Sequence, residues 1–154
     1  MKQEMVVYKP KKDLWIVALV YASSFVTFAT GVFVLSENHR EPVTVITAIT
    51  LFLISAFVMW IVLRMEYLVD EKSIIVFFGP FKKIIPVEDF IKINQHYTSF
   101  NTPALWKFTL ANEIVSLQYQ KKGSILKTWI SLSPLNKKEF IEHICKINEN
   151  IIVD

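Results

Sequence analysis

Residues 14–35 read LWIVALVYASSFVTFATGVFVL and contain no charged side chain. Residues 43–63 read VTVITAITLFLISAFVMWIVL and are equally free of charge, after a polar connection at residues 36–42. A helix rises about 1.5 Å per residue, so each stretch is long enough for the ~30 Å hydrocarbon core of a bilayer. Core helices of soluble proteins seldom run past about 18 residues without a charge. The two stretches therefore predict a transmembrane helical hairpin over residues 14–63.

Lysine and arginine residues around the hairpin indicate its orientation. Residues 1–13 form a basic tail with four lysines, four further basic residues lie between 64 and 83, and the connection offers Arg40 alone. Because basic residues flanking spanning helices favour the cytoplasmic side, we expect both termini in the cytoplasm. A cleaved signal peptide is disfavoured, since the apolar run is too long and no Ala-x-Ala-like site ends it.

Neither stretch contains Asp, Glu, Lys, Arg or His. Ionisable groups inside a membrane usually mark ion or proton paths, so a passive anchor is favoured over a transporter or channel. Ser23, Thr27 and Gly31 recur at intervals of four, which would align them on one helix face. This stripe fits a closely packed hairpin, a homo-oligomer interface or the ordinary composition of spanning helices, and the sequence does not choose among them.

Residues 64–154 form one small domain in which short apolar bursts alternate with turn residues. We predict seven short strands, at residues 66–69, 73–78, 82–86, 90–97, 105–110, 114–119 and 124–131. A helix follows, with Ser133 or Asn136 at its N-cap and an apolar side formed by Phe140, Ile141, Ile144, Ile147 and Ile151. This order predicts an α+β domain, a pleckstrin-homology (PH)-like antiparallel barrel of about seven strands closed by a C-terminal helix.

Several short segments of this domain resemble a bacterial PH-like domain family. They are residues 67–70 (YLVD), 74–75 (II), 85–89 (IPVED), 101–105 (NTPAL), 130–134 (ISLSP) and 138–141 (KEFI). The family occurs in small membrane-anchored proteins of the Bacillus type and includes the sublancin immunity protein. The resemblance implies a bacterial cell membrane location and, in its narrowest form, bacteriocin immunity. Trp106 departs from the family pattern, which usually has a serine after the Pro-Ala-Leu segment.

The sequence contains no pattern typical of catalysis or of a cofactor site. His39, His96 and His143 lack metal-ligand spacing, the chain has only three glycines and therefore no phosphate-binding loop, and Cys145 lies beside Ile144 where a core position is expected. Residues 65–154 carry 11 lysines and 10 acidic residues, which provides no basic patch for nucleic acid. We therefore expect no enzyme activity, no cofactor and no metal.

A non-catalytic binding module is the function that remains. We expect its candidate binding surface to include Phe81, Lys82, Lys83, Asn101 and Trp106, because paired lysines and exposed aromatic residues near a membrane contact lipid or protein. The expected partners are the lipid bilayer itself and either a membrane protein or a bacteriocin target. The alternative is a membrane-associated enzyme or transporter subunit without a recognisable catalytic motif.

Overall fold

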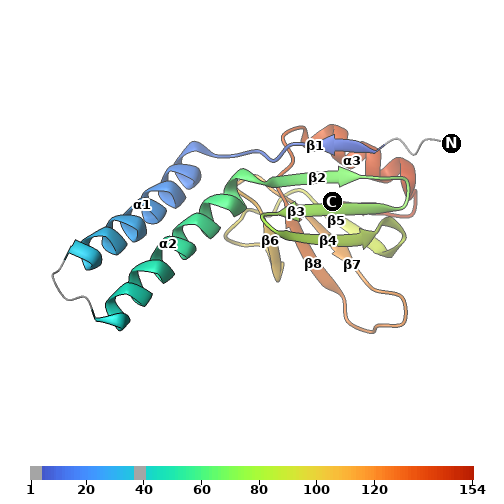
Figure 1. The fold of residues 1–154 in the computed structure, drawn as a ribbon. Helices are drawn as coiled ribbons and strands as arrows, with labels where there is room; N and C mark the ends of the chain where they lie inside the picture. The colour runs from blue at the N-terminus through green and yellow to red at the C-terminus, as the bar shows by residue number, and fades with distance from the viewer. Residues whose placement is uncertain (1–4, 37–40) are drawn as a thin grey trace.

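The computed structural model describes residues 5–36 and 41–154. Two long helices extend from a sheet domain, which is closed on one side by a shorter helix (Figure 1). In chain order the elements are β1 (Val6–Tyr8), α1 (Leu14–Ser36), α2 (Pro42–Leu63), β2 (Met65–Val69), β3 (Ser73–Phe78), β4 (Phe81–Pro86), the 3-10 turn η1 (Val87–Asp89), β5 (Phe90–Asn94), β6 (Trp106–Phe108), β7 (Val115–Tyr119), β8 (Thr128–Leu132), α3 (Lys137–Ile147) and β9 (Ile152–Val153).

The helical pair, α1 and α2, matches the two uncharged stretches of the sequence. Both helices are long and apolar enough to cross a membrane. Small residues lie where the helices touch, namely Ser24 and Gly31 on α1 and Ala48 and Ser55 on α2. The other side chains of the pair are largely exposed, among them many large apolar ones. A helical pair that turns apolar side chains outward fits a lipid environment and not the interior of a soluble domain.

Both ends of the helical pair meet the same sheet. Strand β1, which precedes α1, pairs antiparallel with β2, which follows α2, in the register Val6↔Val69, Val7↔Leu68 and Tyr8↔Tyr67. The backbone of Lys12 forms an isolated parallel β-bridge with Leu110. Residues 6–12, predicted from the sequence as part of a separate basic tail, therefore pack on the sheet domain. Lys2 of that tail and Arg40 of the connection lie outside the described residues.

The predicted closed barrel is wrong. The strands form two separate sheets, one in the order β1-β2-β3-β4 and the other in the order β6-β8-β7-β5-β9. All seven predicted strands are present, with β1 and β9 added at the two ends of the chain. The pairs β5–β9 and β6–β8 are parallel, so the second sheet is not purely antiparallel. The short β6 pairs with β8 alone, which leaves β4 and β6 as unpaired sheet edges.

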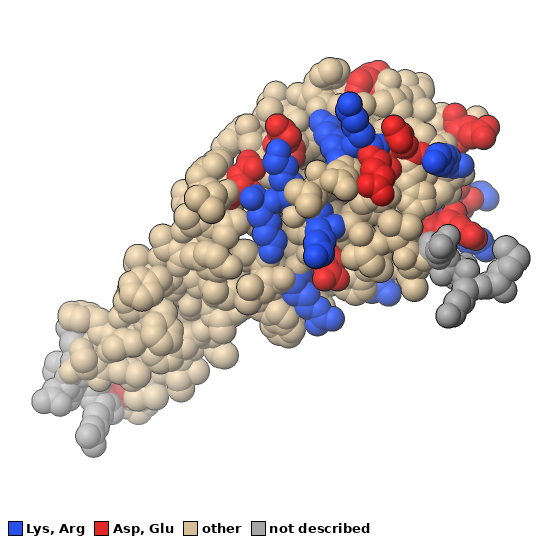
Figure 2. Space-filling view, turned by 90° about the horizontal axis from the view of Figure 1, so that it is seen from above, with Lys and Arg blue, Asp and Glu red and all other residues tan. Residues whose placement is uncertain are grey.

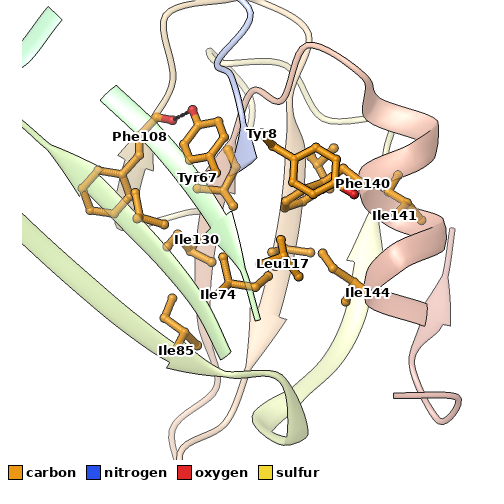
Figure 3. Close-up of a cluster of buried hydrophobic side chains, with 14 of the residues drawn as sticks. Tyr8, Tyr67, Ile74, Ile85, Phe108, Leu117, Ile130, Phe140, Ile141 and Ile144 are labelled. Atoms are coloured by element: carbon orange, nitrogen blue, oxygen red, sulfur yellow. Dashed lines mark hydrogen bonds between the residues drawn. The ribbon is translucent and has the colours of Figure 1, made fainter. Parts of the chain in front are cut away.

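The core lies between the two sheets and α3 (Figure 3). Its fully buried side chains include Tyr67, Leu117, Ile130, Phe140 and Ile144. The prediction of the C-terminal helix is confirmed, and Phe140, Ile141 and Ile144 of its predicted apolar side are buried. The helix ends at Ile147, so the predicted Ile151 lies beyond it. The helix begins after Asn136, and the Asn136 amide donates to the Glu139 carboxylate over 3.1 Å. Cys145 is half-buried at the margin of this core.

Candidate functional site: an aromatic and lysine cluster beside the helical pair

The side chain of Lys83, on the edge strand β4 of one sheet, reaches towards the edge strand β6 of the other. Its ammonium is 4.0 Å from the centre of the Trp106 ring and 5.9 Å from the centre of the Tyr119 ring. The side chain is half-buried, and this partial desolvation lowers the pKa of Lys83. A cation over an indole face is attracted by the ring quadrupole. The two sheet edges are therefore joined here by side chains in place of backbone pairing.

Four aromatic rings connect this lysine to the end of α2. Phe81 contacts Phe57 of α2 edge-on, with ring centres 6.1 Å apart, and Phe78 on its other side at 5.3 Å. Phe78 contacts Phe108 at 4.8 Å, and Phe108 stacks on Trp106 at 6.3 Å. The set Phe78, Phe81, Lys83, Trp106 and Phe108 is called the edge cluster below. Phe81 and Trp106 keep 51% and 48% of their surface exposed, so the cluster is open to a partner.

The turn between β3 and β4 fixes the edge cluster against α2. The Gly79 N–H donates to the Arg64 carbonyl over 2.9 Å, at the C-terminal end of α2. Gly79 has φ +56°, and a Cβ added there would lie 2.9 Å from Cγ1 of Ile61. Glycine is required at this turn by both its conformation and its close approach to the helix. The cluster is thus held next to the end of the helical pair.

The five sequence-predicted surface residues do not all meet. Phe81, Lys83 and Trp106 converge in the edge cluster. Lys82 points to the opposite face of β4, as strand alternation requires, and its ammonium lies 5.6 Å from the centre of the Phe77 ring. Asn101 lies in the loop before β6. Its side-chain oxygen, Oδ1, accepts hydrogen bonds from the Thr98 N–H at 2.6 Å and from the Thr98 hydroxyl at 3.0 Å. The role of Asn101 in the structure is to hold that loop.

The loop that contains Asn101 is fixed to the core by hydroxyl groups. Buried Thr102 bonds to Ser116 at 3.0 Å and to Ser131 at 2.9 Å, and these two serines bond to each other at 2.9 Å. Exposed Phe100 stacks on Trp15 at the start of α1, with ring centres 6.5 Å apart. Thr102 and Trp15 were not predicted as part of the site, because a single-sequence pattern does not connect them. This loop therefore adds further aromatic surface beside the helical pair.

Charged residues are concentrated on the sheet domain. Figure 2 shows lysine, arginine, aspartate and glutamate intermixed over that domain, while the visible face of the helical pair is almost free of them. Within residues 5–36 and 41–154, no three His, Cys, Asp or Glu side chains gather as metal ligands would. His143 is engaged with the Tyr8 hydroxyl at 3.0 Å, and His39 lies outside the described residues. The edge cluster offers stacking, apolar contact and one ammonium group.

The segment between β7 and β8 corrects another prediction. Residues 124–131 were expected to form one strand, but β8 begins at Thr128 and residues 120–127 form a loop. Ile125 and Leu126 are exposed at its tip. The sequence did contain a signal for this loop. The adjacent apolar residues Ile125 and Leu126, which follow Gly123 closely, break the alternation that a half-buried strand requires.

Comparison with known proteins identifies a family for the sheet domain. Residues 65–148 match a family model described as bacterial PH domain. Searches of curated proteins and of solved structures returned no match. The matched segment runs from the start of β2 to the end of α3 and covers more than half of the 154 residues. The chain belongs to the bacterial PH domain family.

Proposed function

We propose that this protein is an integral membrane protein whose helical pair holds a non-catalytic PH-like binding module at the cytoplasmic surface of a bacterial cell membrane. The observation that carries the proposal is the pairing of β1 with β2. Strand β1 precedes α1 and strand β2 follows α2. The sheet domain therefore holds the N-terminal end of α1 and the C-terminal end of α2 on the same side of the membrane. Two spanning helices joined in this way cross the membrane out and back, and the excess of basic residues beside the domain supports the cytoplasmic side.

The edge cluster is the binding surface of this proposal. It lies against the end of α2 through the contact of Phe81 with Phe57. A half-buried ammonium such as that of Lys83 pairs more strongly with a phosphate or carboxylate than a fully hydrated one does. Exposed Trp106 and Phe81 supply the amphipathic ring surface that is common at membrane interfaces. Its partner is a membrane protein or the lipid headgroups of the leaflet.

A narrower form of the proposal is immunity to a bacteriocin such as sublancin, and it rests on the motif resemblance. Expression of the full chain in a sensitive strain, followed by a peptide challenge, tests it. Protection that is lost in Trp106→Ala with Lys83→Gln, and retained in the matched surface variant Lys138→Gln, would support immunity through the edge cluster. Failure of the well-expressed wild-type chain to protect against any bacteriocin tried would contradict the immunity form alone.

Membrane insertion and orientation are tested with single cysteines in a Cys145→Ser background. We expect Glu41→Cys, at the start of α2, to react with a membrane-impermeant thiol reagent in whole cells. Glu149→Cys, exposed just beyond α3, should react only after the cells are opened. The protein should also stay with the membrane after carbonate extraction. Labelling of Glu149→Cys in intact cells would overturn the orientation, and release by carbonate would overturn the anchoring itself.

A further inference from the structure

The loop between β7 and β8 presents two apolar side chains to solvent. Ile125 is 94% exposed and Leu126 is 78% exposed. Lys121, Lys122 and Lys127 flank them and are exposed as well. Residues 120–127 contain no acidic side chain. An apolar tip with a basic rim is the arrangement that amphipathic segments use on anionic membrane surfaces.

The loop holds these side chains outward through its own hydrogen bonds. The Gln120 amide donates to the Ser124 carbonyl over 2.7 Å, and the Ser124 N–H donates to the Lys121 carbonyl over 2.8 Å. The Leu126 N–H donates to the Ser124 hydroxyl over 3.2 Å. Gly123 supplies the turn with φ +84°. The tip is thus a folded structure, and its apolar side chains are not turned back towards the core.

The position of the loop relates it to the membrane anchor. In Figure 1 both the loop and the helical pair extend below the body of the sheet domain. The base of the loop adjoins the edge cluster, because Lys83 lies 5.9 Å from the ring centre of Tyr119, the last residue of β7. The edge cluster in turn contacts α2 through Phe81. The base of the loop also adjoins the end of the sheet far from α2, since the Gln120 N–H donates to the Asp89 carbonyl over 2.9 Å. The tip therefore extends in the same downward direction as the helices in Figure 1, at a distance from them along the domain.

We propose that residues 121–127 form a second membrane contact, in which Ile125 and Leu126 enter the headgroup region of the leaflet that holds the helical pair. The three lysines then meet the phosphate groups of anionic phospholipids. This inference rests on the proposed membrane anchoring and adds to it. With the helical pair as the one membrane contact, the pair and the attached domain can still tilt together in the membrane, whereas a distant loop contact fixes one face of the domain on the lipid.

Charge and tethering select lipid as the occupant. Each lysine near an anionic leaflet contributes a favourable attraction, and three of them surround the apolar tip. The helical pair already confines the loop to the surface, so even a weak intrinsic contact is populated. A second copy of the chain would place two basic rims against each other, which like-charge repulsion opposes. An anionic leaflet would bury the exposed apolar side chains and place phosphate groups beside the lysines.

The test uses the full chain with Cys145→Ser, reconstituted in vesicles of phosphatidylcholine with or without phosphatidylglycerol. Ile125→Cys carries an environment-sensitive fluorophore, and Glu149→Cys with the same label is the matched control. We expect the label at position 125 to shift to shorter wavelength, to brighten about twofold or more, and to be quenched by doxyl-labelled lipid. The label at position 149 should remain water-like in both kinds of vesicle.

A charge comparison completes the test. Lys121→Gln, Lys122→Gln and Lys127→Gln together should abolish the response to phosphatidylglycerol. The control variant, Lys72→Gln with Lys138→Gln and Lys146→Gln, has the same net charge and should keep that response. A water-like label at position 125 in a protein that resists carbonate extraction would overturn the loop contact alone. Release of the protein by carbonate would overturn the membrane anchoring, and a signal that fades on dilution of protein in lipid would assign the tip to a second copy.

Discussion

The hydroxyl of Tyr67 donates a hydrogen bond to the backbone carbonyl of Phe108 over 2.5 Å (Figure 3). The same hydroxyl oxygen accepts from the Ser133 N–H at 3.2 Å. Tyr67 belongs to β2 in one sheet, whereas Phe108 belongs to β6 in the other. A single buried side chain thus joins the two sheets, in a protein in which the edge strands β4 and β6 do not pair with each other.

Replacement of Tyr67 by phenylalanine should destabilise the sheet domain. The ring would still fill its site, but the Phe108 carbonyl and the Ser133 N–H would each lose a partner in the core. A buried polar group without a partner costs about 1–3 kcal/mol. We expect a loss of that order in the free energy of unfolding, measured by denaturant titration of the full chain in detergent. An unchanged unfolding midpoint would mean that the bond does not connect the sheets energetically.

Tyr67 also predicts a pH dependence. Burial raises its pKa to about 12, an effect that the hydrogen bonds with Ser133 partly oppose. An unfolded tyrosine titrates near 10, so the folded state holds the proton more tightly. The contribution to stability is therefore complete below pH ~10 and declines as the pH rises towards 12. Unfolding free energies measured across this window should fall more steeply in the wild type than in Tyr67→Phe.

The contact between Lys83 and Trp106 should appear as a coupling energy. A cation–aromatic pair is worth about 0.5–1 kcal/mol at partly exposed sites. We expect a double-mutant cycle with Lys83→Met and Trp106→Leu to give a coupling of that size in unfolding free energy. Lys82→Met is the matched control, because Lys82 lies on the other face of β4, over Phe77, and should show no coupling to Trp106. Equal coupling for both lysines would contradict the geometry.

Much of the fold could be predicted because its signals are local. The uncharged stretches predicted α1 and α2 to within one residue at each end, since helix length and apolar content are read directly from the chain. The turn at Gly79 and Pro80 separated β3 from β4 for the same kind of reason. Strand β1 was missed because three residues, Val6 to Tyr8, become a strand only by pairing with residues about sixty positions away. Barrel closure likewise depends on pairing between distant sheet edges.

The candidate site was predictable only in part. Phe81, Lys83 and Trp106 were chosen as exposed aromatic or basic residues, and the fold brings them together. Lys82 was included as the neighbour of Lys83, although alternation along β4 sends it to the other face. Ile125 and Leu126 were read as part of a strand, because a run of apolar residues looks the same in a buried strand and at an exposed tip. Exposure is a property of the tertiary structure.

The two glycines with positive φ allow a matched comparison. Gly79→Ala would place a left-handed alanine 2.9 Å from Cγ1 and 3.2 Å from Cα of Ile61, whereas Gly123→Ala meets nothing within 4 Å. The conformational cost of about 1 kcal/mol is common to both. We expect Gly79→Ala to lose clearly more stability than Gly123→Ala, in thermal unfolding of the full chain in detergent. Similar losses would show that the contact between the β3–β4 turn and α2 is easily displaced.

The serine contact inside the helical pair gives the last prediction. The hydroxyls of Ser24 and Ser55 lie 2.8 Å apart, and each is within hydrogen-bond distance of the other residue's backbone carbonyl, at 3.1 and 3.0 Å. Bonds of this kind between spanning helices contribute about 0.5–1.5 kcal/mol. We expect Ser24→Ala and Ser55→Ala each to weaken the pair by that amount, and the double variant to lose less than the sum, because both changes remove the same contact.

Ser23→Ala is the control for this prediction, since the exposed Ser23 hydroxyl donates only to the Val20 carbonyl of its own helix, at 2.9 Å. Unfolding in mixed micelles, followed by fluorescence transfer between labels placed near the ends of α1 and α2, measures helix separation directly. Ser23→Ala should leave the midpoint unchanged. An equal shift for Ser23→Ala and Ser24→Ala would mean that helix propensity, not the contact between α1 and α2, controls the stability of the pair.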